Sequence, residues 1–280
     1  MTDMTEGGGT RGNSKDYIDH NHIDRSPHFP QTAHAEDFFK RQRIVTLLVK
    51  PQIYSKQEFS TLKTVKNDIV HTSDWSRLDD NIFFPKWVVI DQGLAIGKCF
   101  GIVQTTPEDL LAWMYQTDSN QNKEKHIRQN GPDKSKYPDG EILRLNTHHR
   151  ITYSCRKLPS PIAARDWLAR GIWFRVDSDN YNFLYKSIED DDPDLPSNFK
   201  RSTLQNVVRG ELTAFYEFKR LPFGQTKFTM TARVDIKGSV PKALANRAIK
   251  GFMNTVRRAY EYFERDVEVD EMERSGETCL

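Results

Sequence analysis

The stretch GSVPKALANRAIKGFMNTVRRAYEYF, residues 238–263, decides the fold. Gly238 and Pro241 mark a turn, because Gly permits unusual backbone angles and Pro fixes φ in the first turn of a helix. Apolar side chains then recur at three- and four-residue steps, which predicts one amphipathic helix of about 25 residues. Its apolar face carries Ala245, Ile249, Phe252, Val256, Tyr260 and Phe263, and its basic face carries Lys242, Arg247, Lys250, Arg257 and Arg258.

The chain before this helix is dominated by strand signals. Ser55 and Glu58 form a capping-box pattern that opens a helix over about 55–71, and Thr106-Pro107 opens a second helix. Residues 118–140 predict a loop with a short helix. The strands predicted from β-branched and aromatic runs are 87–90, 95–103, 141–147, 149–157, 164–176, 181–189, 206–221 and 226–237. The fold class is therefore α+β, a curved antiparallel sheet wrapped around the long C-terminal helix.

The composition restricts the class of protein. The 280 residues carry a formal net charge of +2, so no global field attracts nucleic acid. Three cysteines without C-x-x-C spacing fit a reducing compartment. No apolar run is long enough to span a bilayer, and no secretory signal is present, which predicts a cytoplasmic protein. Residues 1–36 and 269–280 are expected to be flexible tails around one domain, 37–268.

Three segments of this domain resemble START domains, the StAR-related lipid-transfer family. They are Lys157-Leu-Pro-Ser-Pro-Ile-Ala-Ala-Arg-Asp-Trp167, Val208-Arg-Gly210 and Val234-Asp-Ile-Lys-Gly-Ser-Val-Pro-Lys242. Their order and spacing extend the resemblance over about residues 55–266. The resemblance implies a helix-grip fold that holds one lipid in an internal hydrophobic cavity and exchanges it at membrane surfaces.

The resemblance also implies which residues contact the lipid and the membrane. The loop 157–164 would form a flap over the cavity, with Leu158 and Ile162 at its apolar tip and Lys242 and Lys250 on the neighbouring helix as membrane contacts. The residues expected to bind lipid are Thr152, Trp167, Gly171, Trp173, Tyr216, Arg233, Ile249, Phe252, Val256 and Tyr260.

The ligand class follows from two positions. Sterol-binding START domains carry an acid and an arginine where this chain has Thr152 and Gly171, and strand alternation turns Arg170 to the opposite face. The loop pattern is closest to the phosphatidylcholine-transfer branch, so a phospholipid or other two-chain lipid is expected. Because a buried phosphate needs a donor, Arg233 or Tyr216 would have to supply it.

Catalytic signatures are lacking. There is no Gly-x-Ser-x-Gly elbow, Walker loop or dinucleotide fingerprint, and His148-His149 has poor spacing for a metal pair. The sequence therefore predicts a monomeric, non-enzymatic lipid carrier without cofactor or metal, in transient and reversible contact with membranes. Two alternatives stay open: a helix-grip enzyme acting on a hydrophobic substrate, and a non-transferring lipid sensor or interaction module.

Overall fold

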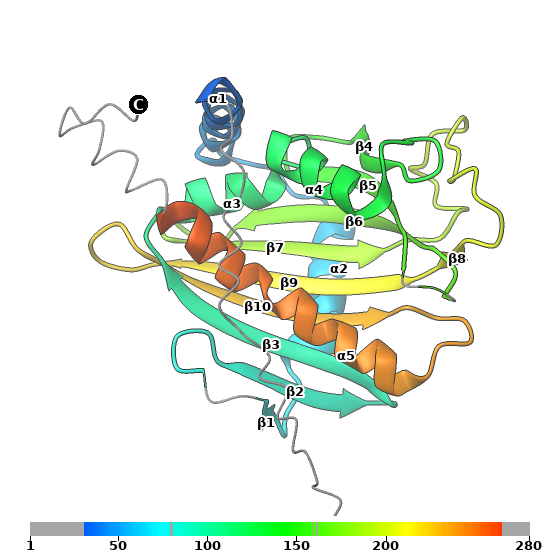
Figure 1. Cartoon of the computed structure of the whole chain (residues 1–280). Helices are drawn as coiled ribbons and strands as arrows, with labels where there is room; N and C mark the ends of the chain where they lie inside the picture. The colour runs from blue at the N-terminus through cyan, green and yellow to red at the C-terminus, as the bar shows by residue number, and fades with distance from the viewer. Residues whose placement is uncertain (1–30, 79–80, 159, 161, 265–280) are drawn as a thin grey trace, which may run out of the picture.

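A single antiparallel sheet forms the centre of the molecule in the computed structural model, which describes residues 31–78, 81–158, 160 and 162–264 (Figure 1). The strands follow the order β1-β2-β3-β10-β9-β7-β6-β5-β4, and β8 pairs in parallel with β6. Their bounds are β1 Ser76–Arg77, β2 Lys86–Asp91, β3 Leu94–Val103, β4 Asp139–Arg144, β5 His149–Arg156, β6 Arg165–Arg175, β7 Asn180–Ser187, β8 Val208–Arg209, β9 Glu211–Arg220 and β10 Thr226–Asp235.

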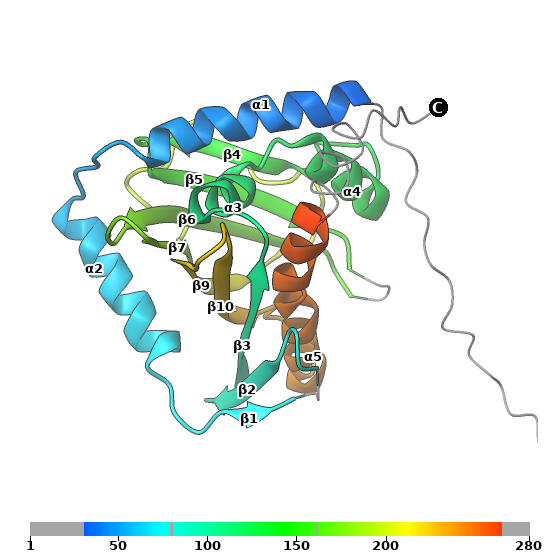
Figure 2. The same cartoon turned by 90° about the vertical axis from the view of Figure 1, so that its left-hand side faces the viewer.

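Helices lie on both faces of this sheet (Figure 2). They are α1 Gln31–Leu48, α2 Lys56–Val65 with a π-helical extension Lys66–Val70, α3 Pro107–Tyr115, α4 Asn120–Asn130 and α5 Lys242–Met253. After a turn at Asn254 the chain is helical again over 255–264. Among the described residues, no helix combines the length and apolarity needed to cross a bilayer.

The helix starts follow from local chemistry. The Ser55 hydroxyl accepts a hydrogen bond from the Glu58 amide, and the Glu58 carboxylate accepts one from the Ser55 amide at 2.7 Å, which completes the predicted capping box. Thr106 caps α3 through the amide of Asp109, and Pro107 follows at the first helical position. Both predicted helix starts are confirmed.

Strand alternation gives the sheet two different faces. The inner face carries Tyr216, Phe228 and Met230, which pack with α3 and the C-terminal helix in one core. The outer face carries Ile172 and Phe215, which pack against α2. The outer side of β5 and β6 is covered by apolar residues of the segment 188–207.

The C-terminal helix is held close to one half of the inner face. α5 contacts mainly β3 and β10. A Cβ added at Gly97 of β3 would lie 2.7 Å from Ile249 and 2.9 Å from the Met253 sulfur. Glycine at this position therefore sets how closely the helix approaches the sheet.

The three segments that resemble START domains meet at one junction. Arg165 donates to the carbonyl oxygens of Ile236 and, at 3.0 Å, Lys237, which fixes the turn before α5. Asp166 accepts from Arg209 at 3.1 Å. The two side chains point to opposite faces of β6 and bind the ends of other elements, as expected for residues with a structural role.

The structure differs from the sequence predictions in three elements. α1 begins at Gln31, inside the segment predicted to be a tail; the rest of that prediction, like the C-terminal tail, lies outside the described residues. The predicted strand 206–221 is divided at Gly210, because β8 turns away to pair with β6. The predicted long helix is interrupted at Asn254.

Candidate functional site

Part of the inner face is not covered by helices. Because α5 lies over β3 and β10, several inner-face side chains of β5, β6, β7 and β9 stay only half-buried, together with one residue of α5. We call this surface the inner patch. It comprises Thr152, Ser154, Trp167, Tyr185, Leu212 and Phe252.

A row of aromatic rings borders the inner patch. Tyr216 stacks on Phe183 with ring centroids 5.8 Å apart and on Phe228 at 6.1 Å, and Phe183 contacts Tyr185 at 4.7 Å. Burial raises the pKa of Tyr216, so its hydroxyl keeps its proton. The sheet therefore offers an apolar surface with isolated hydroxyl groups, as lipid and cofactor sites commonly do.

Most of the residues predicted to bind lipid lie on the inner side. Thr152, Trp167, Phe252 and Tyr260 keep accessible surface. Ile249, Val256 and Tyr216 are buried beneath or beside the C-terminal helix. Gly171 is on the inner face, where a Cβ would lie 2.9 Å from the ring of Tyr185.

Two of the predicted residues do not contribute to the inner patch. Arg233 points to the outer face, because its neighbours Ala232 and Val234 take the inner positions, and it pairs with Asp91 at 3.4 Å. The prediction that Arg233 donates to the lipid is therefore wrong. Trp173 is fully buried, and its indole donates to the carbonyl of Thr147 at 3.1 Å, so it belongs to the core.

The residues predicted to contact membranes are positioned as follows. Leu158 and Ile162 in the loop between β5 and β6 are half-buried, and Lys250 is exposed on α5. The backbone of Lys242 begins α5, but its side chain lies outside the described part.

An arginine that sequence reasoning missed lies on the inner face. Arg150 pairs with Gly171 across β5 and β6, and is fully buried. Its guanidinium lies 3.8 Å from the ring centroid of Tyr115 and donates to the Tyr185 hydroxyl at 2.8 Å. The signal was present in the sequence, because Arg150 and Thr152 are two residues apart and must share a face.

Three cationic side chains from separate elements gather beside the inner patch: Lys125 of α4, Arg156 of β5 and Arg258 of the helical segment 255–264. Arg156 is fixed under α4, donating to Asp139 at 3.1 Å and contacting His126 Nδ1 at 2.9 Å. Lys125 has no ion pair to any residue that the structure describes.

The surroundings of this cation cluster are poorly hydrated. Burial, together with the weaker effects of the charges on Arg258 and Arg156, lowers the pKa of Lys125 to about 8. Arg258 keeps accessible surface, yet loss of hydration also lowers its pKa, as does Arg156. Arg258 is exposed, as its position on the basic face of the predicted helix implies, and it donates to the Thr255 hydroxyl at 2.8 Å.

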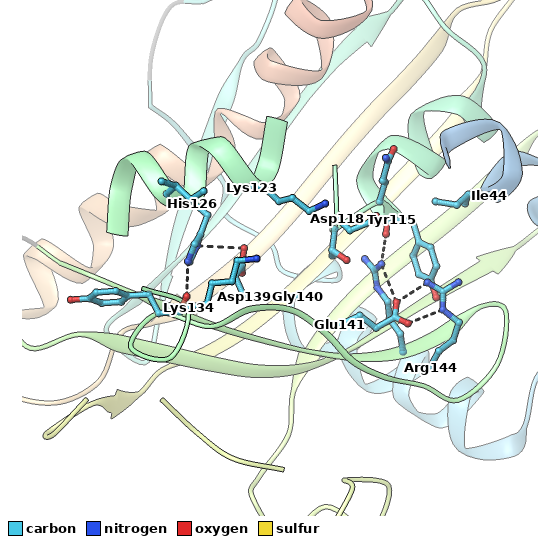
Figure 3. A pocket seen from close by; sticks show the side chains of 15 residues that line it. Ile44, Tyr115, Asp118, Lys123, His126, Lys134, Asp139, Gly140, Glu141 and Arg144 are labelled. Carbon is cyan, nitrogen blue, oxygen red and sulfur yellow. Dashed lines mark hydrogen bonds and ion pairs between the residues drawn. The ribbon is translucent and has the colours of Figure 1, made fainter. Parts of the chain in front are cut away.

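A second region of interest is a pocket of about 520 Å³ between α1, α4 and β4 (Figure 3). Its rim carries exposed charges, including Lys123, Lys134 and Glu141. Its floor is formed by Tyr115 and Arg150, both essentially inaccessible to solvent. Burial raises the pKa of Tyr115 to about 12, which keeps its hydroxyl protonated.

Histidine side chains in the sheet bind a carboxylate. His148 Nε2 and His149 Nδ1 each lie 3.0 Å from Oε1 of Glu58. Across residues 31–264, so far as they are described, no group of three or more His, Cys, Asp or Glu is placed to hold a metal ion. The two histidines instead connect α2 to the sheet.

This architecture, a curved antiparallel sheet gripping a C-terminal helix, is the helix-grip fold of START domains. The structure of human STARD10 aligns with a TM-score of 0.55 at 17% identity, covering 81% of this chain and 85% of that one. The lipid transfer and protein localization domain of human StarD13 (DLC2) aligns with a TM-score of 0.51 at 15% identity, covering 76% and 98%. A STAR-related lipid transfer protein from Xanthomonas axonopodis gives 0.52 at 13% identity, covering 69% and 99%.

The likeness rests on structure alone. No protein-family model matches the sequence, and no curated protein matches it either. Identities this low establish the shared fold, so the ligand has to be argued from the residues of this chain.

Proposed function

We propose that this protein binds a single lipid on the inner face of its sheet and transfers it between membranes from the cytoplasm. The observation that carries the proposal is the inner patch, where apolar and aromatic side chains stay partly accessible inside a START-type fold. An exposed apolar surface costs about 25 cal/mol per Å² in water, so covering it with acyl chains is favourable.

The proposed ligand is a phospholipid. Lys125, Arg156 and Arg258 repel one another beside the inner patch, and an anionic phosphate would compensate their charges. These cations replace Arg233 as phosphate donors. Chains on the inner patch and a phosphate at the cation cluster match the two parts of a two-chain phospholipid.

The first test identifies the ligand. Protein purified gently from cells is extracted and analysed by mass spectrometry, and lipid-free protein is assayed for transfer of a fluorescent phospholipid between liposomes. We expect one bound phospholipid per chain and catalysed transfer. Protein that carries no lipid and transfers none would contradict the proposal.

The second test uses neighbouring arginines of one helical segment. Arg258→Gln removes a charge from the cation cluster, whereas Arg257→Gln removes a charge whose side chain is 63% exposed and pairs with Glu261. A charged hydrogen bond contributes about 1.5–3 kcal/mol, so Arg258→Gln should weaken phospholipid binding about tenfold or more. If the two variants bound phospholipid with equal affinity, the cation cluster would not be part of the ligand site.

A further inference from the structure

The pocket between α1, α4 and β4 has a floor with unused hydrogen-bonding groups (Figure 3). The Tyr115 hydroxyl, Arg150 Nε and Gln116 Nε2 are buried without a partner, and their residues are 1%, 0% and 5% exposed. Each unmade hydrogen bond of a buried group costs about 1–3 kcal/mol. All three groups can donate a proton, so a molecule bound there would supply acceptor oxygens.

The charges of the pocket favour a negative ligand. Its carboxylates already have cationic partners: Glu141 pairs with Arg144 at 2.7 Å, and Asp139 with Arg156 at 3.1 Å. Asp118 lies 3.6 Å from Lys40.

The rim adds positive charge. Lys123 and Lys134 line the pocket, and within the described part of the chain neither forms an ion pair. The side chains of the pocket that lack a charged partner are therefore mainly cations and neutral hydrogen-bond donors.

We propose that this pocket is a second ligand site, which binds a small oxygen-rich anion of the phosphate-ester or carboxylate class. A volume of about 520 Å³ is typical of small-molecule sites and exceeds what one inorganic phosphate fills. The buried donors of Tyr115, Gln116 and Arg150 bind its oxygens, and the rim lysines neutralise its charge. This site does not depend on the lipid proposal, since none of its lining residues belongs to the inner patch and it is tested on lipid-free protein.

The experiment follows the side-chain Nε–H resonance of Arg150 by NMR while glycerol 3-phosphate or citrate is added to the full-length, lipid-free protein. We expect a saturable shift of this resonance. A parallel titration with short-chain phosphatidic acid identifies the source of the anion. A shift with glycerol phosphate indicates a soluble ligand, and a shift with the lipid alone indicates that the pocket takes a lipid headgroup. No saturable shift with any of the three probes would overturn the proposal.

Variants separate binding from folding. Tyr115→Phe removes only the unpartnered hydroxyl, so the fold should be retained while affinity falls about tenfold. Lys134→Gln on the rim should also weaken binding, whereas Lys136→Gln, an exposed neighbour that does not line the pocket, should leave it unchanged. Unchanged affinity in Tyr115→Phe, or equal losses in both lysine variants, would contradict this assignment.

Discussion

Asp166 is a fully buried carboxylate that binds three side chains at the base of the loop between β5 and β6. It accepts from Tyr153 at 2.8 Å, from Arg201 at 2.9 Å and from Arg209 at 3.1 Å. Asp166→Ala leaves Arg209 without its buried partner, and breaking a buried ion pair typically costs about 3–5 kcal/mol. We expect a loss of about 3 kcal/mol in the free energy of unfolding, measured by urea denaturation.

Asp190 provides the matched control for that experiment. It pairs with the same two arginines, but its side chain is 52% exposed. Exposed pairs contribute about 0–1 kcal/mol, so Asp190→Ala should change stability little. Similar losses in both variants would mean that burial does not determine the strength of this junction.

Lys125 should destabilise the lipid-free protein. Its pKa is about 8 in the folded chain and 10.5 in its ordinary state, so between these values the unfolded chain binds more protons. The free energy of unfolding should therefore rise as the pH increases from about 8 to 10.5. The loss of stability caused by the charged Lys125 is fully present below about pH 8. Arg156 faces Lys125 from the sheet, and Arg258 faces it from the last helix.

The test of this penalty is Lys125→Met. At about pH 7 the variant should be more stable by roughly 1 kcal/mol or more, and above about pH 10 the difference should vanish. The same variant should bind phospholipid more weakly, because it lacks one of the three cations proposed to bind the phosphate. A residue that serves binding can lower the stability of the free protein. Arg128→Met, at an exposed position of α4 that does not line the pocket, should show neither change. Urea denaturation at the two pH values measures the difference, and a destabilised Lys125→Met would contradict the argument.

At the scale of elements, two glycines test how the C-terminal helix is held. Gly97→Ala places a methyl group 2.7 Å from Ile249, so α5 or β3 must shift, at a cost of about 1–3 kcal/mol. Gly251→Ala in α5 meets nothing within 4 Å and should stabilise the protein by about 0.5–1 kcal/mol through helix propensity. Thermal unfolding of both variants should therefore give shifts of opposite sign; a stabilising Gly97→Ala would show that the contact is loose.

Elements with strong local signals could be predicted from the sequence. The capping box at Ser55, the proline of α3 and the turn Asp91-Gln-Gly93, where Gln92 and Gly93 have φ of 49° and 82°, all occur where their chemistry requires them. The resemblance located the inner face correctly for Thr152 and Gly171. Alternation also placed Arg170 on the outer face, where it binds Asp192 at 2.6 Å.

The remainder depends on contacts distant in sequence. α1 was missed because its apolar residues do not gather on one face of the helix; Ile44, Val45 and Leu48 become core only by packing with α3. The cation cluster joins residues of α4, β5 and the last helix, and no local pattern predicts such a meeting. Arg233 was misassigned because strand alternation was not applied to β10. Its neighbours Ala232 and Val234 point to the inner face, so Arg233 must point to the outer face.

At the scale of the whole molecule, the two proposed sites are connected through Arg150. Its side chain forms part of the pocket floor and donates to the hydroxyl of Tyr185, which belongs to the inner patch. An anion that binds Arg150 would reorient this donor, so the two ligands are expected to affect each other's affinity equally. Adding glycerol 3-phosphate should therefore change phospholipid affinity in the natural chain. In Tyr115→Phe the same change should require about tenfold more glycerol 3-phosphate.

Transfer also requires the whole molecule to meet a membrane, and the exposed side of α5 is the surface that we expect to do so. Each Lys near an anionic bilayer contributes about 1 kcal/mol, so Lys250→Glu should slow transfer from anionic vesicles about tenfold or more, while phospholipid affinity in solution stays unchanged. Lys219→Glu makes the same charge change at an exposed position of β9 and should have little effect. Because salt screens this attraction, raising ionic strength should slow the natural chain but hardly affect Lys250→Glu. Equal transfer rates for the natural chain and Lys250→Glu would mean that another surface, such as the loop that carries Leu158 and Ile162, makes the contact.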